Sequence, residues 1–332
     1  KAFLQGASMK FVIDMMGGDH GVETTIGAVK EFLKLHDDVY FYCVGNVECL
    51  SPLEGLDRVT IVPSTEVLKM DVDPMEAMHK KDSSLNIAME TYLKENCDCL
   101  VSAGSTGALV SEGVFKIKRM AGIKRPCLVS PFPTVIKGKN FVCADLGANT
   151  ENTSENLLQF AKITSIFYRI AYNCENPKVY LLNNGTEEEK GNNLMKETYQ
   201  LLKNDPSINF KGNMEAREPL NGECDVLITD GFTGNIFLKS TEGACKVMSN
   251  LIKRSFKTNF MTKIGYLFAK KGFKDMSETM DYKSTGGAML LGVNGLLIKA
   301  HGSSDVRTFV SSLKIGYRLS KNDIINKIKE NL

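Results

Sequence analysis

Histidine is scarce in this 332-residue chain, with only four residues, and its nine cysteines nowhere show CxxC spacing. A histidine-centred metal cage and a zinc site are therefore not expected, and no metal or cofactor is predicted. Cys43, Cys99 and Cys143 lie in apolar, strand-like runs, which is typical of reduced core cysteines in a cytoplasmic protein. No apolar run approaches the roughly 20 residues of a membrane-spanning helix, and no secretory signal is apparent.

The motifs of several common enzyme classes are also missing. The chain has no GxxxxGKS/T loop, no GxSxG elbow and no HExxH pair, and Gly17-Gly18-Asp19 does not match GxGxxG. A P-loop kinase, a serine hydrolase of the elbow type and a zincin protease are therefore not expected. The net charge of +2 carries little information, so that any electrostatic argument must come from local clusters.

Length and composition set the expected domain organisation. A chain of 332 residues with 43% hydrophobic residues suits one large α/β domain or two intimate lobes. We expect residues 9–332 to form a single catalytic α/β domain with a helical hairpin at about residues 245–280. Residues 1–8, ahead of Met9, are expected to be the remnant of an expression tag.

The most informative stretch covers residues 229–235, with the sequence TDGFTGN. The apolar run 226–228 before it predicts a buried strand, and the pattern after it predicts a long helix. The free N–H groups and the dipole of a helix start attract anions, and Gly231 and Gly234 allow the backbone to approach a ligand. A tight turn without a ligand is the alternative, and the pattern alone leaves both open.

A second stretch with similar spacing, called the echo below, occurs earlier in the chain. Residues 97–108 align without gaps on residues 224–235, and Cys, Asp, Leu, Gly, Thr and Gly recur at equal spacing. The chain therefore twice makes a strand that ends in a turn of small residues and starts a helix. Parallel strands place such turns along one edge of a sheet, where open α/β sheets bind ligands. Convergent turn chemistry would explain the echo equally well.

Similar units recur along the chain. Strands are predicted at residues 10–16, 141–144, 178–182 and 295–300, and each ends in a turn rich in Gly, Asn, Asp or Ser. Residues 71–84 are polar, contain Pro74 and are predicted to be a loop over the sheet edge. Strands that alternate with helices predict a mostly parallel sheet with helices on both faces.

Two basic clusters stand out. The cations at residues 253–274 surround an apolar stripe made of Phe256, Phe260, Ile264, Leu267 and Phe268. Either this helix packs on the core, or it is a basic amphipathic element that suits an anionic membrane surface. The other cluster consists of Lys116, Lys118, Arg119, Lys124 and Arg125. It is either a solvated face or a docking site for an acidic partner.

The strand ends together supply many backbone N–H and hydroxyl donors, which suit phosphate. They predict an enzyme that positions phosphate and stabilises a developing negative charge, without a covalent nucleophile or a metal. Lys190 follows three glutamates, so it either belongs to a surface ion-pair cluster or, because Gly185 and Gly191 flank its loop, is the cation of a loop that closes on phosphate. Asn235, at a predicted helix start, is the candidate donor to an oxyanion.

The motifs resemble those of one family in order, from Met9 to the C-terminus. They are IDMMGGD at residues 13–19, SAGSTGA at 102–108, DLGAN at 145–149, GTEEEKGN at 185–192, DGFTGN at 230–235 and HGSS at 301–304. The family is that of the bacterial acyl-ACP:phosphate acyltransferases (PlsX) of phospholipid biosynthesis. Small departures are Met15 for the usual Ala, Ser105 for the common Asn and Met289 for a frequent Pro.

The resemblance implies a transferase of lipid metabolism. Orthophosphate would attack the thioester of a fatty acyl chain on acyl carrier protein, giving acyl phosphate and the free carrier. The fold would be a three-layer αβα sandwich with a mostly parallel sheet, like isocitrate/isopropylmalate dehydrogenases and phosphotransacetylases, with a protruding helical hairpin. A homodimer in the cytoplasm, peripherally bound to an anionic membrane, would pass its product to a membrane glycerol-3-phosphate acyltransferase. No nucleic acid is expected as a partner.

The resemblance also matches Lys190 and Asn235 to the family's proposed catalytic pair. His20 and His301 are expected either to assist proton movement or to make structural hydrogen bonds. The stripe of residues 256–268 is the expected membrane contact. The expected phosphate- and substrate-binding residues are Asp14, Gly17, Gly18, Asp19, His20, Ser102, Gly104, Ser105, Thr106, Gly107, Asn149, Asp230, Gly231, Thr233, Gly234, Gly286, Gly287, His301, Gly302 and Ser303.

Two other functions remain open at this point. One is a phosphate acetyl- or butyryltransferase that acts on acyl-CoA, and the other is a membrane-surface scaffold for enzymes of lipid synthesis. A decarboxylating dehydrogenase would need clustered metal-binding aspartates and an arginine-rich substrate site, and neither is evident in the sequence.

Overall fold

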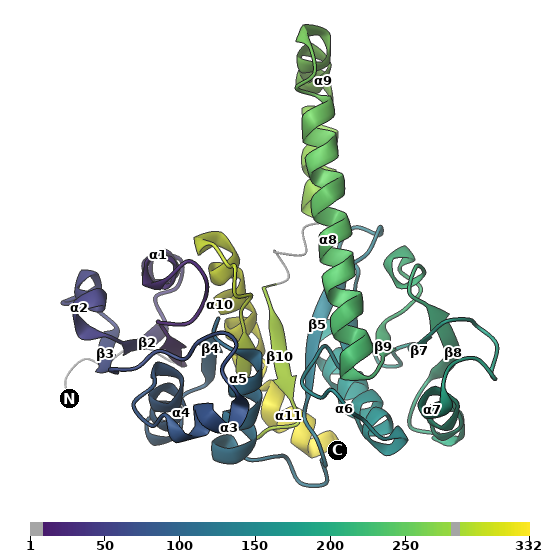
Figure 1. Ribbon diagram of the computed structural model, residues 1–332, viewed down its shortest axis with the longest axis horizontal. Helices are drawn as coiled ribbons and strands as arrows, with labels where there is room; N and C mark the ends of the chain where they lie inside the picture. The colour runs from purple at the N-terminus through teal and green to yellow at the C-terminus, as the bar shows by residue number, and fades with distance from the viewer. Residues whose placement is uncertain (1–8, 280–285) are drawn as a thin grey trace. The chain divides into compact units, whose positions relative to one another are not determined.

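The computed structural model describes residues 9–279 and 286–332, and the chain forms two compact α/β units (Figure 1). The first unit contains residues 9–129, 169–173 and 286–332, and the second contains residues 130–168 and 174–279. The chain crosses between the units within strand β5 (Cys127–Pro133) and near the end of helix α6 (Ser154–Tyr172). The expected tag remnant, residues 1–8, lies outside the described residues.

The first unit is built on a mostly parallel sheet with the order β3-β2-β1-β4-β11-β10-β5. Only β10 runs antiparallel, to both β11 and the start of β5. The core is aromatic where Phe11, Phe32 and Phe41 pack with ring centroids 5.8–6.4 Å apart. Its further strands are β1 (Met9–Asp14), β2 (Val39–Gly45), β3 (Val59–Pro63), β4 (Cys99–Ser102), β10 (Ala288–Leu291) and β11 (Leu297–Lys299).

Helices lie on both faces of this sheet, with α1 and α10 together on one face and α4 on the other (Figure 1). A short 3-10 helix, Ser51–Leu53, and a π-helical turn, Gly113–Ile117, complete the unit. The helices are α1 (Val22–Leu35), α2 (Val47–Leu50), α3 (Pro74–His79), α4 (Ser84–Lys94), α5 (Thr106–Glu112), α10 (Val306–Lys321) and α11 (Ile324–Asn331).

Helix α3 corrects one prediction, because residues 71–84 were expected to be a loop. The Asp73 carboxylate accepts hydrogen bonds from the N–H groups of Met75 and Glu76, at 2.9 and 3.2 Å. Pro74 occupies the first helical position, where a missing N–H does no harm. The capping signal was therefore present in the sequence, but the helix is too short to show the helical spacing of apolar residues.

The second unit has a parallel sheet with the order β6-β9-β7-β8. Phe132, Phe141 and Phe237 pack together in its core, with centroids 5.1 and 5.5 Å from the ring of Phe132. Its strands are β6 (Asn140–Ala144), β7 (Val179–Asn183), β8 (Phe210–Glu215) and β9 (Val226–Ile228); its helices are α7 (Asn193–Asn204), α8 (Gly231–Ser255), α9 (Phe260–Thr279) and the 3-10 turn Pro219–Asn221.

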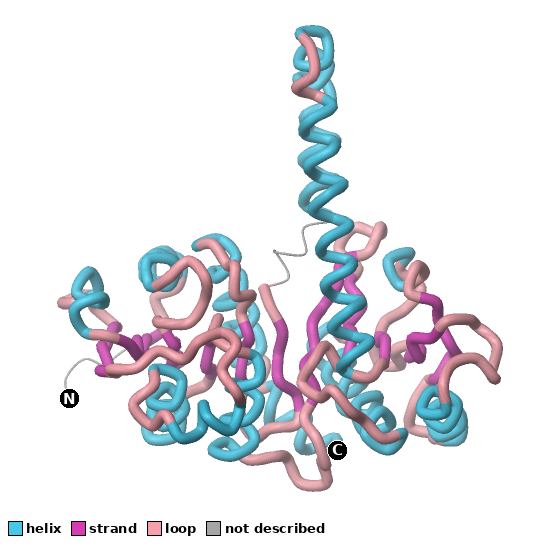
Figure 2. The backbone as a smooth tube through the Cα atoms, viewed as in Figure 1, coloured by secondary structure: helices cyan, strands magenta, loops and turns pink. Residues whose placement is uncertain are grey.

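Helices α8 and α9 form a hairpin that extends beyond the strands of the second unit (Figure 2). The two helices are joined by an aromatic cluster, in which Phe256 lies 5.4 Å from Tyr266 and 4.6 Å from Phe273 between ring centroids. This packing leaves Phe256 and Ile264 half-buried. Of the predicted stripe, only Phe260, Leu267 and Phe268 are therefore well exposed.

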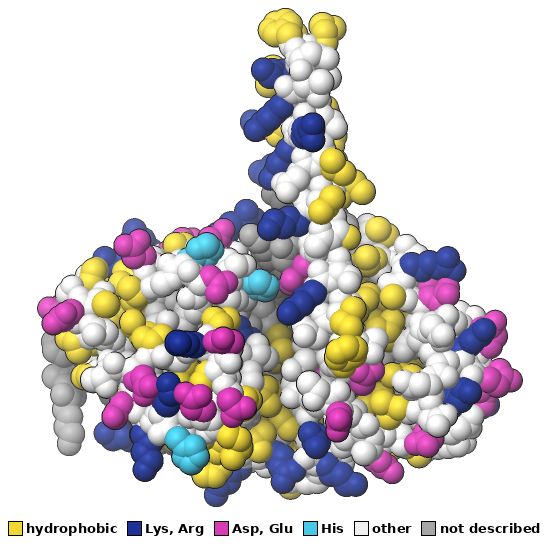
Figure 3. All heavy atoms as spheres, in the orientation of Figure 1, with side chains coloured by type: hydrophobic (Ala, Val, Ile, Leu, Met, Phe, Trp, Pro, Cys, Tyr) yellow, Lys and Arg dark blue, Asp and Glu magenta, His cyan; other side chains and the backbone are white. Residues whose placement is uncertain are grey.

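The tip of the hairpin presents an apolar surface to solvent. Phe260, Met261, Leu267 and Phe268 have exposed fractions of 70–87%, so they do not pack on a core. Hydrophobic side chains gather at the tip and along one side of the hairpin, and Lys and Arg side chains along the other (Figure 3). Within residues 9–279 and 286–332, no helix is long and apolar enough to cross a membrane.

Candidate functional site

Three polar side chains meet at the carboxyl ends of neighbouring strands in the first unit. Asp14 of β1 is in register with Ser102 of β4, which is in register with Lys299 of β11. The Ser102 hydroxyl donates to Asp14 Oδ2 at 2.7 Å and accepts from the N–H of Gly104 at 3.0 Å. All three residues are buried, so this network is fixed before any ligand arrives.

Lys299 is a functional candidate that the sequence reasoning missed. Its ammonium group donates to the carbonyl oxygens of Ala103 at 3.3 Å and Ala300 at 2.5 Å. Burial lowers the pKa of Lys299 to about 8, although the nearby carboxylates of Asp14 and Asp19 raise it. A single lysine within the apolar run 296–300 was the signal that could have found it.

The glycine-rich turns of the first unit come together, as predicted. Gly17 touches the backbone of Gly104 so closely that an added Cβ would lie 2.5 Å from its nitrogen. The N–H of Asp19 donates to the Gly302 carbonyl at 2.7 Å. A small cavity remains among these turns, lined in part by Gly18, His20, Ala103, Gly302 and Ser304.

Both histidines of these turns are exposed. His301 Nδ1 accepts from the N–H of Ser303 at 3.2 Å, and the Ser303 hydroxyl lies 2.9 Å from it. The buried hydroxyl of Ser304 has no hydrogen-bond partner within the described part of the chain. Among the described residues that line the cavity are therefore the unpartnered hydroxyl of Ser304 and the exposed imidazole of His20.

The other predicted residues of the first unit are less accessible. The Ser105 hydroxyl caps α5 by accepting from the N–H of Ala108 at 3.4 Å, and Gly107 faces Pro74 of α3. The first turn of α5, which includes Thr106, is thus partly covered by the helix that replaced the expected loop. Gly286 lies against the Ser311 carbonyl of α10 and Gly287 against the Lys299 carbonyl, so packing accounts for both.

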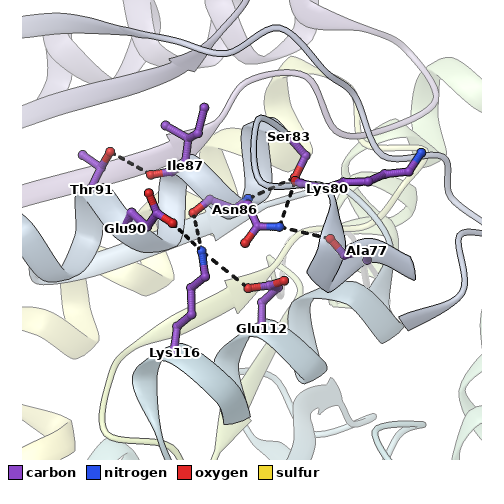
Figure 4. A network of polar contacts seen from close by, with 9 residues as sticks. All are labelled: Ala77, Lys80, Ser83, Asn86, Ile87, Glu90, Thr91, Glu112 and Lys116. Carbon is purple, nitrogen blue, oxygen red and sulfur yellow. Dashed lines mark hydrogen bonds and ion pairs between the residues drawn. The ribbon is translucent and has the colours of Figure 1, made fainter. Parts of the chain in front are cut away.

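A polar network ties α3, α4 and α5 together (Figure 4). The Lys116 ammonium lies 2.8 Å from Glu90, 3.3 Å from the Asn86 carbonyl and 3.8 Å from the Glu112 carboxylate. Burial raises the pKa of Glu112. Asn86 in turn donates to the carbonyls of Ala77 and Lys80, both at 3.0 Å. The Lys116 charge is therefore largely compensated inside the protein.

In the second unit, α8 begins directly against the turn formed by residues 145–149. The Asp230 carboxylate caps the helix by accepting from the N–H of Thr233 at 2.9 Å. A Cβ on Gly234 would lie 1.9 Å from the Asp145 carbonyl oxygen, and one on Gly231 would lie 2.1 Å from that of Asn149. Helix packing therefore requires both glycines, and this contact accounts for them without a ligand.

The 145–149 turn is itself held by hydrogen bonds. Asp145 Oδ2 accepts from both the backbone N–H and the side-chain amide of Asn149, each at 2.9 Å. Asn235 lies half-buried over Gly147, where an added Cβ would be 3.7 Å from its Nδ2. The Asn235 amide forms no hydrogen bond with a described residue.

Lys190 follows β7, the strand beside β9 in the same parallel sheet. Its loop is fixed at two carbonyls, since Asn183 donates to that of Lys190 at 3.0 Å and Asn213 to that of Glu187 at 2.7 Å. The Lys190 stem crosses Gly185, and its ammonium makes no ion pair with any residue that the structure describes. Glu188 is turned away and pairs with Lys203.

Lys190 and Asn235 therefore lie beyond the carboxyl ends of adjacent parallel strands in one unit. The echo is also confirmed as two strand–turn–helix units, but its helices begin at different aligned positions. Helix α5 starts at Thr106 after the cap Ser105, whereas α8 starts at Gly231, which aligns with Gly104. Phe232, on the first turn of α8, has an exposed side chain.

A family model described as "Fatty acid synthesis protein" matches residues 9–327. The chain belongs to this family. It is 40% identical to a phosphate acyltransferase of an Exiguobacterium species, over 97% of this chain and 98% of the relative. It is also 40% identical to a phosphate acyltransferase of Clostridioides difficile, over 97% of this chain and 96% of the relative. The resemblance seen in the motifs is thereby confirmed.

A solved structure supports the fold. A phosphotransacetylase from Streptococcus pyogenes superimposes with a TM-score of 0.59 at 17% identity, covering 95% of this chain and 94% of that one. Similarity at this identity shows the fold alone. It confirms the predicted α/β class with a mostly parallel sheet.

Proposed function

We propose that this protein transfers an acyl group from acyl carrier protein to orthophosphate, giving acyl phosphate and free carrier protein. The observation that carries the proposal is the 40% identity to phosphate acyltransferases over nearly the whole length of both chains. The acyl phosphate would feed glycerol-3-phosphate acylation by a membrane enzyme in phospholipid synthesis. An acetyl- or butyryl-CoA transferase has only the fold likeness in its favour.

The chemistry needs few groups, because phosphate is itself the nucleophile. A phosphate oxygen forms a bond to the thioester carbon, and the carbonyl oxygen becomes an oxyanion. The oxyanion then collapses, the C–S bond breaks, and the carrier thiolate leaves and takes a proton from water. Lys190 would hold the phosphate through its free ammonium, and Asn235 would donate its amide hydrogen to the oxyanion.

The turns of the first unit, considered by themselves, carry donors of another kind. Backbone N–H groups at the ends of β1, β4 and β11 are suited to phosphate oxygens. Asp14 and Ser102 hold these turns in place, and Lys299 balances part of the carboxylate charge. The unpartnered Ser304 hydroxyl and the exposed His20 and His301 complete the polar groups of this region.

Exposed surfaces support a proposal for the assembly and location of the protein. The apolar tip of the hairpin, with cations along one side, would insert reversibly into an anionic membrane surface. Toward the C-terminal end of α8, the side chains of Val247, Met248 and Leu251 are 52–60% exposed. A second copy of the chain would cover them in a homodimer. The exposed cations Lys118, Arg119, Lys124 and Arg125 would meet the acidic carrier.

The catalytic pair is tested by Lys190→Ala and Asn235→Ala. Each change should lower kcat by roughly a hundredfold, the scale for losing one preorganised charge-stabilising group. Phosphate-dependent release of carrier thiol is the measurement, and thermal melts should change little. Lys211→Ala and Asn250→Ala, which remove an exposed lysine and an exposed asparagine of the same unit, are the matched controls. Near-normal rates in both test variants would refute the assignment.

A further inference from the structure

The first turn of α8 exposes two large apolar side chains beside Asn235. Phe232 is 62% exposed and Ile236 is 51% exposed. Residues three and four apart are neighbours on a helix surface, so Phe232 adjoins both Asn235 and Ile236. The core-facing side of the helix is a different one, marked by Phe237, which is buried against Phe132.

The exposure of this pair has no structural explanation within the unit. Single exposed apolar residues are common, but two adjacent ones beside a candidate catalytic amide form a surface that favours an apolar ligand. Hydrophobic side chains gather at this end of α8 in the space-filling view (Figure 3). The surface is bounded on the next turn by the exposed Lys239.

The membrane surface proposed for the hairpin tip cannot cover this pair. From Phe232 to Ser255, where α8 ends, the helix rises by roughly 35 Å, at 1.5 Å per residue. A bilayer that takes up Phe260 and Phe268 therefore leaves Phe232 and Ile236 outside it. An apolar ligand beside Asn235 would remove these two side chains from water.

We infer that Phe232 and Ile236 form the start of the binding surface for the acyl chain of the substrate. The inference rests on the proposed function, in which the thioester carbonyl lies at the Asn235 amide. The first methylene groups of the chain are bonded to that carbonyl carbon, so they pass within one helical turn of Asn235. Each methylene group that leaves water on this surface favours binding by about fourfold.

The test is the dependence of kcat/KM on chain length. Acetyl-, octanoyl- and hexadecanoyl-acyl carrier protein are assayed with phosphate and the whole chain. Phe232→Ala should lower kcat/KM for the hexadecanoyl substrate by about tenfold and for the acetyl substrate, which has no methylene group, by at most a few-fold. Ile236→Ala should show the same trend, and Phe232→Leu should restore most of the loss.

Phe115→Ala is the matched control, because Phe115 is 65% exposed and lies in the other unit. It should leave the chain-length profile unchanged. An equal loss at all chain lengths, or no loss, would overturn the inference. So would a change of molecular mass in solution in Phe232→Ala, since a second copy would then cover the surface. Wild-type protein without phosphate-dependent thiol release at any length would instead overturn the proposed function, and this inference with it.

Discussion

Replacing Lys299 with methionine should change how the stability of the protein depends on pH. The ordinary pKa of a lysine is 10.5, and burial lowers that of Lys299 to about 8. The difference of 2.5 units corresponds to about 3 kcal/mol at about 1.4 kcal/mol per unit. This is the free energy by which the folded protein disfavours the charged form of this side chain relative to the unfolded chain.

The sign follows from proton binding. Between pH 8 and 10.5 the unfolded chain keeps the lysine proton more firmly than the folded protein does. The Lys299 contribution to the free energy of unfolding is therefore lowest below pH 8 and rises with pH through this window. Between pH 8 and 9.5 the wild type should gain about 2 kcal/mol relative to Lys299→Met, which has no proton to lose there.

Urea denaturation of both proteins between pH 7 and 9.5 measures this difference. Buried thiols such as Cys43 and Cys143 have raised pKa values and lower the stability at alkaline pH. They are present in both proteins, so their effect cancels when the two curves are subtracted. Parallel curves would refute the reasoning, because they would mean that Lys299 has its ordinary pKa and that its ammonium is solvated.

Two further predictions concern surfaces. Phe260→Asp with Leu267→Asp should abolish co-sedimentation with anionic vesicles and leave activity in solution unchanged. The control Met276→Asp, farther from the tip, should still co-sediment. Unfolding of the double variant would contradict the membrane assignment. Lys118→Glu with Lys124→Glu should lower kcat/KM for acyl carrier protein at low salt and flatten its salt dependence, with Lys211→Glu as control. An unchanged salt profile would place the carrier on the cations after residue 253.

The sequence predicted the strand–turn–helix units well, because each is encoded locally. An apolar run of four to seven residues followed by Gly, Asp or Ser strongly favours a buried strand that ends in a turn. The turns after β1, β4, β6 and β9 lie where the pattern placed them. The long helix after residues 229–235 was also visible, since α8 begins at Gly231, and the hairpin expected at about residues 245–280 corresponds to the outer part of α8 and to α9.

Contacts between residues far apart in the chain could not be predicted from the sequence. The ammonium of Lys299 is held by the Ala103 carbonyl, 196 residues away, and no local pattern encodes such a partner. From the sequence, Gly231 and Gly234 suited either the close approach of a ligand or a tight turn, and the structure places the backbone of the 145–149 turn against them. A glycine indicates that another group approaches its backbone closely, but it does not identify that group as ligand or protein.

The contact between α8 and that turn has a mechanical consequence. Because not even a methyl group fits between Gly234 and the Asp145 carbonyl, the first turn of the helix cannot slide over the turn beneath it. The helix then behaves as a stiff arm, about 25 residues long, whose inner end carries Asn235 and whose outer end carries the apolar tip. A tilt of the arm at its outer end would therefore be passed on to the asparagine amide at its inner end.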